Sequence, residues 1–158
     1  MHVYEATHPV AHSADEMFAL VARVEDYPKF LPLCEGLKVT DRDERDGKEV
    51  LIAIMTVGYS VIHESFTTRV HLDHAAHAIL VEYLDGPFTF LENRWHFHPD
   101  GAGACEVAFY IAYAFRSRLF ERLVGGLFAR AVQKYTAAFE ARADAVYGPK
   151  TVALASEQ

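Results

Sequence analysis

The segment that most constrains the fold is residues 118–147, near the C-terminal end of the sequence. Apolar side chains recur there every three or four positions, which is the period of an amphipathic α-helix. The pattern ends at Gly148 and Pro149, which can cap a helix and then prevent its continuation. A helix of about thirty residues is about 45 Å long at 1.5 Å per residue. Its buried face can therefore cover a whole small sheet, and we expect the rest of the chain to pack against it.

Two adjacent glycines, Gly125 and Gly126, interrupt this helical pattern. Together they destabilise a helix by about 2 kcal/mol relative to two alanines. Two interpretations stay open. Either another part of the molecule approaches the helix closely at this point, or the glycines mark a kink or break between two helices.

The residues before this helix are typical of an antiparallel sheet with one short helical region. Residues 2–8 resemble an edge strand, and residues 14–23 a helix that begins with a capping box formed by Ser13 and Glu16. A stiff loop containing Pro28 and Pro32 follows. Six further segments alternate apolar and polar residues between turn residues, at 36–44, 48–57, 60–72, 78–84, 88–98 and 104–115.

One apolar face of such a sheet has to be covered, and the terminal helix is the largest element that can cover it. The predicted fold class is therefore α+β: a curved antiparallel sheet of about seven strands wrapped around a long C-terminal helix. Because a curved sheet and a straight helix do not fit along their whole length, we also expect an apolar cavity between them. Such a cavity is the default candidate for a binding site.

Composition indicates a single domain, because 158 residues with 51% hydrophobic side chains provide one sizeable core. We expect the domain to cover residues 1–148 and residues 149–158 to form a flexible tail. The formal net charge of -7 argues against nucleic acid as a partner. The isolated Cys34 and Cys105, together with the lack of a spanning helix or signal pattern, favour a cytoplasmic protein.

Several segments together resemble the coenzyme Q-binding proteins of the START-like superfamily. Bacterial relatives in this superfamily include ribosome-association toxins and proteins described as polyketide cyclase or dehydrase. No single segment is specific, but their order and spacing are, over about residues 3–147. The matching segments are VEDYPKFLPLC at 24–34, FTTRV at 66–70, DGPF at 85–88, LENRWHF at 91–97, CEVAF at 105–109 and AFEARA at 138–143.

The resemblance implies a helix-grip fold with an apolar tunnel for a polyprenyl quinone. It further implies a non-enzymatic carrier or chaperone that supports ubiquinone function in respiratory electron transport. Because quinones reside in bilayers, such a protein would contact the surface of the inner membrane transiently. Ubiquinone is then a bound ligand, and no catalytic cofactor is expected.

The candidate ligand residues come from one face of each predicted strand, from the facing helix and from the proline-rich loop. Most of these residues are expected to be ordinary core. A lid at the cavity mouth is predicted from Tyr27, Phe30 and Leu31, stiffened by Pro28 and Pro32, with Gly125 and Gly126 of the helix beside it. Ordinary packing of this loop on the sheet edge is the favoured alternative. The residues predicted to line the cavity are Phe30, Leu31, Ile54, Phe66, Val70, Leu91, Trp95, Phe97, Val107, Phe109, Tyr113, Leu123, Leu127, Phe128 and Tyr135.

Four polar side chains on these elements are candidates for orienting the quinone carbonyl groups. They are Tyr59, Glu64, Arg69 and Asn93. For Glu64 and Arg69, a cross-strand ion pair is the favoured alternative.

Histidine spacing raises the question of a metal site. His71, His74 and His77 are closely spaced, and His96 and His98 share one face of a strand. However, His74 and His77 fall in a predicted turn, and no carboxylate accompanies His96 and His98 at a ligand spacing. Solvated histidines are the favoured interpretation, and the sequence predicts no metal site.

No nucleophile with a base, paired carboxylates or phosphate-binding loop is apparent, so no catalytic residues are predicted. Two alternatives to the quinone carrier stay open. The first is a protein that associates with ribosomal subunits, which the acidic charge disfavours. The second is a small cyclase or dehydrase, in which Glu64 or Tyr113 would transfer a proton inside the cavity.

Overall fold

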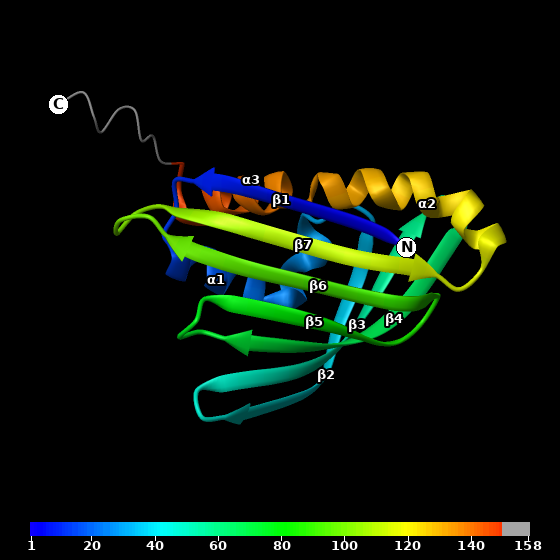
Figure 1. The fold of residues 1–158 in the computed structure, drawn as a ribbon, viewed down its shortest axis with the longest axis horizontal. Helices are drawn as coiled ribbons and strands as arrows, with labels where there is room; N and C mark the ends of the chain where they lie inside the picture. Colours follow the sequence, from blue (N-terminus) through cyan, green and yellow to red (C-terminus); the bar gives the residue numbers. More distant parts are fainter. Residues whose placement is uncertain (150–158) are drawn as a thin grey trace.

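The structure is a computed structural model that describes residues 1–149. Seven strands form one antiparallel sheet in the order β1-β7-β6-β5-β4-β3-β2 (Figure 1). The predicted antiparallel sheet of about seven strands is confirmed, with β2 to β7 as a meander and β1 added beside β7. Each strand boundary differs from its predicted position by a few residues at most. The strands are β1 (His2–Val10), β2 (Cys34–Arg45), β3 (Lys48–Tyr59), β4 (Ile62–Asp73), β5 (Ala78–Asp85), β6 (Phe88–Pro99) and β7 (Cys105–Phe115).

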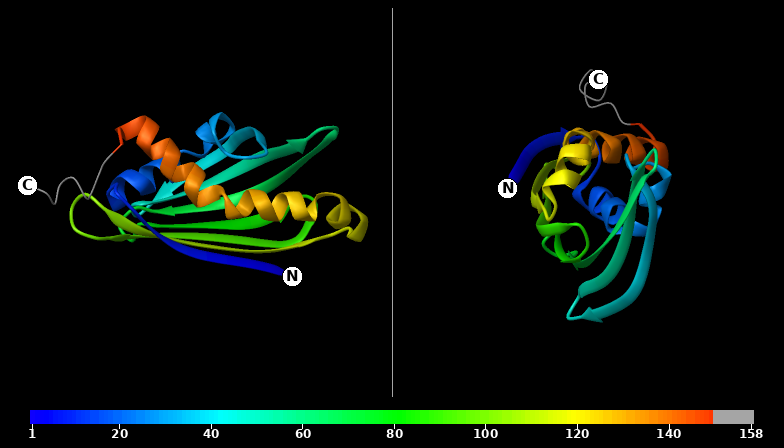
Figure 2. Two further views of the ribbon diagram at one scale, coloured as in Figure 1. Left: turned by 90° about the horizontal axis from the view of Figure 1, so that it is seen from above. Right: turned by 90° about the vertical axis from the view of Figure 1, so that its right-hand side faces the viewer.

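The helices lie on one side of the curved sheet, as the two views of Figure 2 show. They are α1 (Ala14–Ala22), the short 3-10 helix η1 (Val24–Lys29), α2 (Arg118–Gln133) and α3 (Tyr135–Tyr147). In both views, α2 runs along the side of the sheet formed by β1 and β7, away from β2 and β3. This arrangement confirms the expected α+β architecture, in which a curved sheet grips the C-terminal helices.

The start of α1 has the predicted capping box. The Ser13 side chain accepts a hydrogen bond from the backbone N–H of Glu16 at 3.0 Å, and Glu16 Oε1 accepts one from the backbone N–H of Ser13 at 3.1 Å. Two of the otherwise unpaired donors at a helix start are thereby satisfied.

The predicted single helix over residues 118–147 is divided in two at Lys134. Gly125 and Gly126 lie inside α2, eight or more residues before this division. An added Cβ at Gly125 would lie 3.2 Å from Glu121 Cγ, and one at Gly126 would lie 3.5 Å from Arg130 Nη1. Both neighbours belong to α2 itself. The glycines therefore mark neither a close approach of another element nor the break.

The first strand also differs from its prediction, because it continues through Pro9 to Val10. Pro9 lies opposite Glu106 of β7, and β1 is an edge strand of the sheet. An edge strand tolerates a proline because one side of its backbone has no ladder to complete. At the other end of the chain, Gly148 caps α3 with a φ of 89°, as predicted. The predicted flexible tail lies almost entirely outside the described residues.

The core lies between the inner face of the sheet and helices α1 and α3. Phe97 and Phe139 are among its largest fully buried side chains. The Phe139 ring lies 5.0 Å from Trp95, 5.1 Å from Phe30 and 5.2 Å from Tyr27, between ring centroids. Among residues 1–149, no helix has the length and apolar character needed to cross a membrane.

Candidate functional site

A small apolar cavity lies between the inner face of the sheet and the helices η1, α2 and α3. Its volume is about 80 Å³. Strands β2 to β7 supply most of its wall, and the helices close it. The lining residues are Val24, Tyr27, Leu31, Leu37, Ala53, Met55, Phe66, Thr68, Val70, Val81, Leu91, Asn93, Trp95, Ile111, Phe128, Tyr135 and Phe139.

Strand alternation determines which side chains face the cavity. Phe66, Thr68 and Val70 alternate along β4, and they are buried because successive side chains of a strand point to opposite faces. Across the ladder, Ala53 pairs with Thr68 and Met55 pairs with Phe66. On β3, β4 and β6, the residues that line the cavity are therefore every second residue of the strand.

Many of the predicted cavity residues do lie at this site. Those that line the cavity as predicted are Leu31, Phe66, Val70, Leu91, Trp95, Phe128 and Tyr135, and the predicted mouth residue Tyr27 lines it as well.

Five other predicted residues belong to the core instead of the cavity wall. Phe97, Val107, Phe109 and Tyr113 are buried on the inner face of the sheet, whereas Phe30 is half-buried and packs against the Phe139 ring. Pro28 lies within η1, and neither it nor the two glycines of α2 lines the cavity.

Three aliphatic residues were placed wrongly. Ile54 pairs with Thr67 on the opposite face of the sheet, because residues 50–55 are all apolar and their sequence does not reveal which alternate set faces inward. Leu123 is 64% exposed on α2. Leu127 is half-buried but does not reach the cavity.

Of the four polar candidates, Asn93 alone lines the cavity. Arg69 lies on the outer face of β4, with its guanidinium 3.7 Å from Glu82, so the expected pair between Arg69 and Glu64 is not formed. Glu64 is on the inner face of β4 but beyond the cavity wall, and Tyr59 is exposed at the end of β3.

The prediction missed eight lining residues. Val24, Leu37, Ala53, Met55, Thr68, Val81, Ile111 and Phe139 complete the wall. A sequence signal existed for Thr68, because it lies between the predicted inward residues Phe66 and Val70. Ala53 and Met55 required the register of β3, which the sequence alone does not provide.

The polar groups of the cavity wall carry no charge at neutral pH. Asn93 is satisfied at both ends, since its Nδ2 donates to the Tyr110 carbonyl at 2.9 Å and its Oδ1 accepts from Trp95 Nε1 at 3.0 Å. The Tyr27 hydroxyl donates to the Val21 carbonyl at 2.5 Å. Burial raises the pKa of Tyr27 and of Tyr135 far above the ordinary range of a phenol.

Two hydroxyl groups of the wall are different, because they are free to bind a ligand. The Thr68 and Tyr135 hydroxyls both belong to lining residues, and neither has a hydrogen-bond partner among residues 1–149. A hydroxyl can donate one hydrogen bond and accept others. The cavity wall thus contains two unpaired hydroxyl groups among mostly apolar side chains.

A larger hollow of about 1140 Å³ lies on the outer face of the sheet. It is wide open, and its wall includes Glu5, Lys48, Glu82, Arg94 and other charged side chains. Ligand sites are typically enclosed and mostly apolar. We therefore take the smaller inner cavity as the candidate site despite its size.

A family of known proteins matches most of this chain. Residues 10–140 match the family described as "Polyketide cyclase / dehydrase and lipid transport". Among curated proteins, the chain is similar to the ribosome association toxin RatA of Escherichia coli (strain K12), with 33% identity over 89% of this chain and 86% of that protein. It is also similar to the mitochondrial coenzyme Q-binding protein COQ10 homolog B of Xenopus laevis, with 29% identity over 97% of this chain and 62% of that protein.

Among solved structures, the chain is similar to an 18 kDa protein from Caulobacter crescentus. The two share 37% sequence identity with a TM-score of 0.75, over 94% of this chain and 99% of that one. These similarities confirm the resemblance that the ordered segments of the sequence indicated.

Proposed function

The chain belongs to the polyketide cyclase/dehydrase and lipid transport family, and from this premise we propose that it is a non-enzymatic carrier or chaperone of a polyprenyl quinone. Its ligand on this proposal is ubiquinone, and its role is to support ubiquinone function in respiratory electron transport. The similarity to a coenzyme Q-binding protein supports this choice of ligand.

The observation that carries the proposal is the chemistry of the cavity wall. It contains no carboxylate, imidazole, amine or thiol group, and its two phenols have raised pKa values because they are buried. General acid–base catalysis needs a group that titrates near the working pH. A wall without such a group is suited to holding an uncharged apolar molecule, and poorly suited to transforming it.

The free hydroxyls provide the polar contacts that a quinone ring needs. A quinone carries carbonyl oxygens, which accept hydrogen bonds, and Thr68 and Tyr135 supply two unused donors within the apolar wall. Their role replaces the one predicted for Tyr59, Glu64 and Arg69, which do not line the cavity.

The cavity has to widen to admit this ligand. A cavity of about 150 Å³ can hold benzene, whereas this one measures about 80 Å³. The terminal helix is divided at Lys134, and the buried residues of α2 all lie in its C-terminal half, so we expect α2 to be able to move relative to α3. Outward movement of α2 would enlarge the cavity while leaving the sheet intact.

One end of the molecule is suited to transient contact with a membrane. The turn between β3 and β4, the turn between β5 and β6, and the start of α2 meet at the right-hand end of Figure 1. Exposed arginines at 116, 118 and 122 accompany them and can attract anionic headgroups. We call this surface the apolar end and define it by the exposed residues Tyr59, Val61, Leu84, Phe90, Leu119 and Leu123.

The first test is to extract the purified protein with organic solvent and identify the bound molecule by mass spectrometry. We expect ubiquinone in near-stoichiometric amount from protein made in quinone-producing cells. In an Ala53→Leu variant, the added carbons would occupy the cavity and the ubiquinone would be lost. The matched control is Ala108→Leu, which makes the same change on the outer face of β7 and should retain the ligand. Clean extracts from the unmodified protein would contradict tight quinone binding.

A second test concerns the two hydroxyls. Thr68→Val and Tyr135→Phe each remove one donor with little change of shape, so each should weaken quinone binding several-fold, at about 1 kcal/mol per hydrogen bond. Binding can be followed by titrating a short-chain ubiquinone analogue against the change in Trp95 fluorescence. Unchanged affinity in both variants would show that the hydroxyls do not contact the ring.

Ribosome association is the second candidate function, and the 33% identity to RatA supports it. The net charge of -7 weighs against a partner rich in RNA phosphate. Co-sedimentation with ribosomal subunits at low and moderate salt distinguishes the two functions. Stoichiometric co-sedimentation by a protein whose extract contains no quinone would favour this candidate over the carrier.

A cyclase-like activity has less support from the positions of its candidate groups. Tyr113 is packed among Phe88, Phe115 and Phe128, and Glu64 lies outside the cavity wall. Neither group is positioned to transfer a proton to a molecule inside the cavity.

A further inference from the structure

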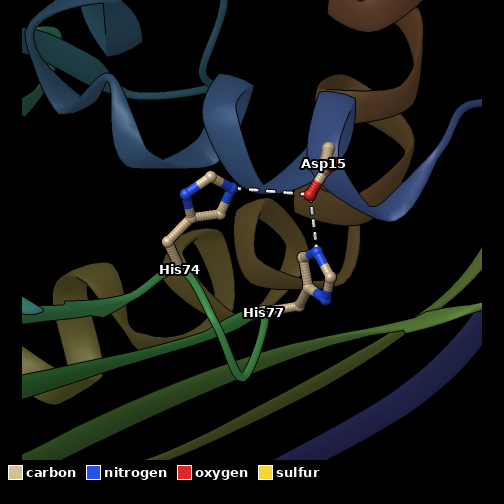
Figure 3. Close-up of side chains that lie close together, drawn as sticks. All are labelled: Asp15, His74 and His77. Carbon is tan, nitrogen blue, oxygen red and sulfur yellow. Dashed lines mark hydrogen bonds and ion pairs between the residues drawn. The ribbon is translucent and has the colours of Figure 1, made fainter. Parts of the chain in front are cut away.

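Three potential metal ligands converge at the end of the sheet opposite the apolar end. Asp15 belongs to the first turn of α1, whereas His74 and His77 belong to the turn between β4 and β5. His77 Nε2 lies 2.7 Å from Asp15 Oδ1, and His74 Nε2 lies 3.4 Å from the same oxygen. The three ligand atoms all lie within 4.8 Å of one another (Figure 3).

The β4–β5 turn holds the two imidazoles on the same side. The backbone N–H of His77 donates to the His74 carbonyl at 3.1 Å, and Asp73 Oδ1 accepts from the backbone N–H of Ala76 at 3.2 Å. His77 itself has a φ of 51°, in the left-handed region. This tight turn brings positions 74 and 77 together and directs both rings toward α1.

Helix α1 supports the rings from its own side. Phe18 lies one turn after Asp15, and residues three apart share a helix face. Its ring stacks on His74 with a centroid distance of 5.1 Å and an interplanar angle of 12°, and it meets His77 edge-on at 6.4 Å. Phe18 is itself buried, so the platform beneath the two imidazoles is fixed.

We propose that Asp15, His74 and His77 bind a divalent transition-metal ion, for which Zn²⁺ is the best match, and that the ion links α1 to the β4–β5 turn. Imidazole and carboxylate together suit zinc and neighbouring metals, whereas magnesium and calcium prefer oxygen ligands alone. In a tetrahedral site with bonds of about 2.1 Å, two ligand atoms lie about 3.4 Å apart. The separations seen here need changes of only an ångström or so to reach that geometry.

Binding changes the hydrogen bond that now joins two of the ligands. In the metal-free arrangement, His77 Nε2–H donates to Asp15 Oδ1. A metal ligand has to present a lone pair, so the neutral imidazole would carry its proton on Nδ1, and the ion would take the place of the Nε2 proton. Asp15 and His74 are largely exposed. Water can therefore complete the coordination.

The sequence did not predict this site because its carboxylate is distant in the chain. Asp15 precedes His74 by 59 residues, and the helix capping box accounts for the residues around it. The other closely spaced histidines lack such a three-ligand arrangement among residues 1–149. His71 pairs with Glu82 at 2.6 Å, and His96 and His98 face each other without a carboxylate in the cluster.

The test is calorimetric titration of the full chain, first stripped of metal, with ZnCl₂ and separately with MgCl₂. We expect one Zn²⁺ per chain, no Mg²⁺ binding, and a thermal unfolding midpoint that rises with zinc concentration, as ligand binding to the folded state requires. Asp15→Asn and His77→Asn should each weaken Zn²⁺ binding at least about tenfold, because losing even an outer-shell partner of a metal site has that effect. Asparagine tolerates the left-handed backbone at position 77.

The matched control is His98→Asn, which removes a histidine from the other close pair. It should bind Zn²⁺ as tightly as the unmodified protein. Zinc binding that survives both Asp15→Asn and His77→Asn, or that is lost in His98→Asn, would overturn the proposal. So would the absence of any binding at a zinc concentration of about 1 mM, which corresponds to a binding free energy weaker than about -4 kcal/mol.

Discussion

Helices α3 and α2 follow each other in sequence but are held to the sheet in different ways. Phe139 and Ala143 of α3 are fully buried. Two hydrogen bonds between histidine and carboxylate side chains also join this helix to the N-terminal segment, from His8 to Glu140 at 2.8 Å and from His12 to Asp144 at 2.7 Å. In α2, the buried residues all lie in its C-terminal half, and its first two turns expose apolar side chains to solvent. Those buried residues are Phe128, Ala131 and Val132.

This difference indicates how a closed cavity can admit a ligand. The cavity lies beneath the junction of the two helices, with Tyr135 and Phe139 from α3 and Phe128 from α2 in its wall. The α3 side acts as a fixed wall because burial and polar pairs hold it together. The buried residues of α2 lie near Lys134, and its first turn is joined to β1 by an exposed contact between His2 and Glu121 at 2.5 Å. A rotation about Lys134 would break this exposed contact, so we expect it to move α2 outward at a modest free-energy cost.

The largest expected effect is that of truncating the aromatic anchor of α3. Phe139→Ala should lower the free energy of unfolding by about 3–5 kcal/mol, the usual range for a buried phenylalanine. Phe128→Ala, in α2, is the matched comparison and should cost less, because α2 can shift to fill part of the space. Urea unfolding followed by circular dichroism measures both. An equal or larger loss in Phe128→Ala would contradict the difference between the two helices.

The next largest effect on the free energy of unfolding is expected from breaking the hydrogen bond between His12 and Asp144 of α3. His12 is 1% exposed, and its Nε2 bonds to Asp144 Oδ1. Asp144→Ala leaves this buried imidazole without its partner and should lower the free energy of unfolding by about 1–3 kcal/mol.

Asp144→Asn is the control for this prediction, because its amide oxygen can still accept from His12. It should retain most of the stability that the alanine variant loses, as judged from the thermal midpoint. If both variants were as stable as the unmodified protein, the hydrogen bond between His12 and Asp144 would not contribute to holding α3.

The contrast between α2 and α3 also separates what the sequence predicted from what it did not. Periodicity predicted the strands, the amphipathic terminal segment and the capping box, because each depends on local spacing. The break at Lys134 has no local signal, since neither glycine nor proline occurs there. The position of the break could therefore not be predicted from the sequence.

The same limit applies to the site. Aromatic residues such as Phe66 and Trp95 were predicted to face inward because their strands alternate clearly. Ile54 was wrongly chosen over Ala53 because both faces of β3 are apolar there, so a one-residue shift of register exchanges the two sets. Asp15 could not be joined to His74 from sequence, since the turn and the helix meet only in the folded chain.

A stabilising substitution in α2 provides a third test of the difference between α2 and α3. Gly126 lies in α2 on the exposed side, and an added methyl group would meet only Arg130 at an ordinary contact distance of 3.5 Å. Gly126→Ala should raise the free energy of unfolding by about 0.5–1 kcal/mol, because alanine loses less backbone entropy in a helix.

The matched control is Gly47→Ala in the β2–β3 turn, where a φ of 78° disfavours a side chain and the change should destabilise the protein. Both effects can be read from the urea midpoint at constant slope. If the flexibility of α2 opens the cavity, Gly126→Ala should also slow the uptake of a quinone analogue. A stabilised variant with unchanged uptake would separate helix stability from cavity opening.

The smallest effect on folding is expected at the start of α2, and there the consequence appears in membrane binding. Leu119 and Leu123 are each 64% exposed, so replacing both with serine should change the free energy of unfolding by less than about 0.5 kcal/mol each. Each leucine that enters a bilayer contributes about 1.5–3 kcal/mol, so binding to anionic lipid vesicles should fall at least about tenfold in the double variant. Val146→Ser, which changes an exposed apolar residue of α3, is the control and should bind vesicles normally. Equal losses in the two variants would mean that the helices contact the membrane alike, contrary to the difference in how they are held.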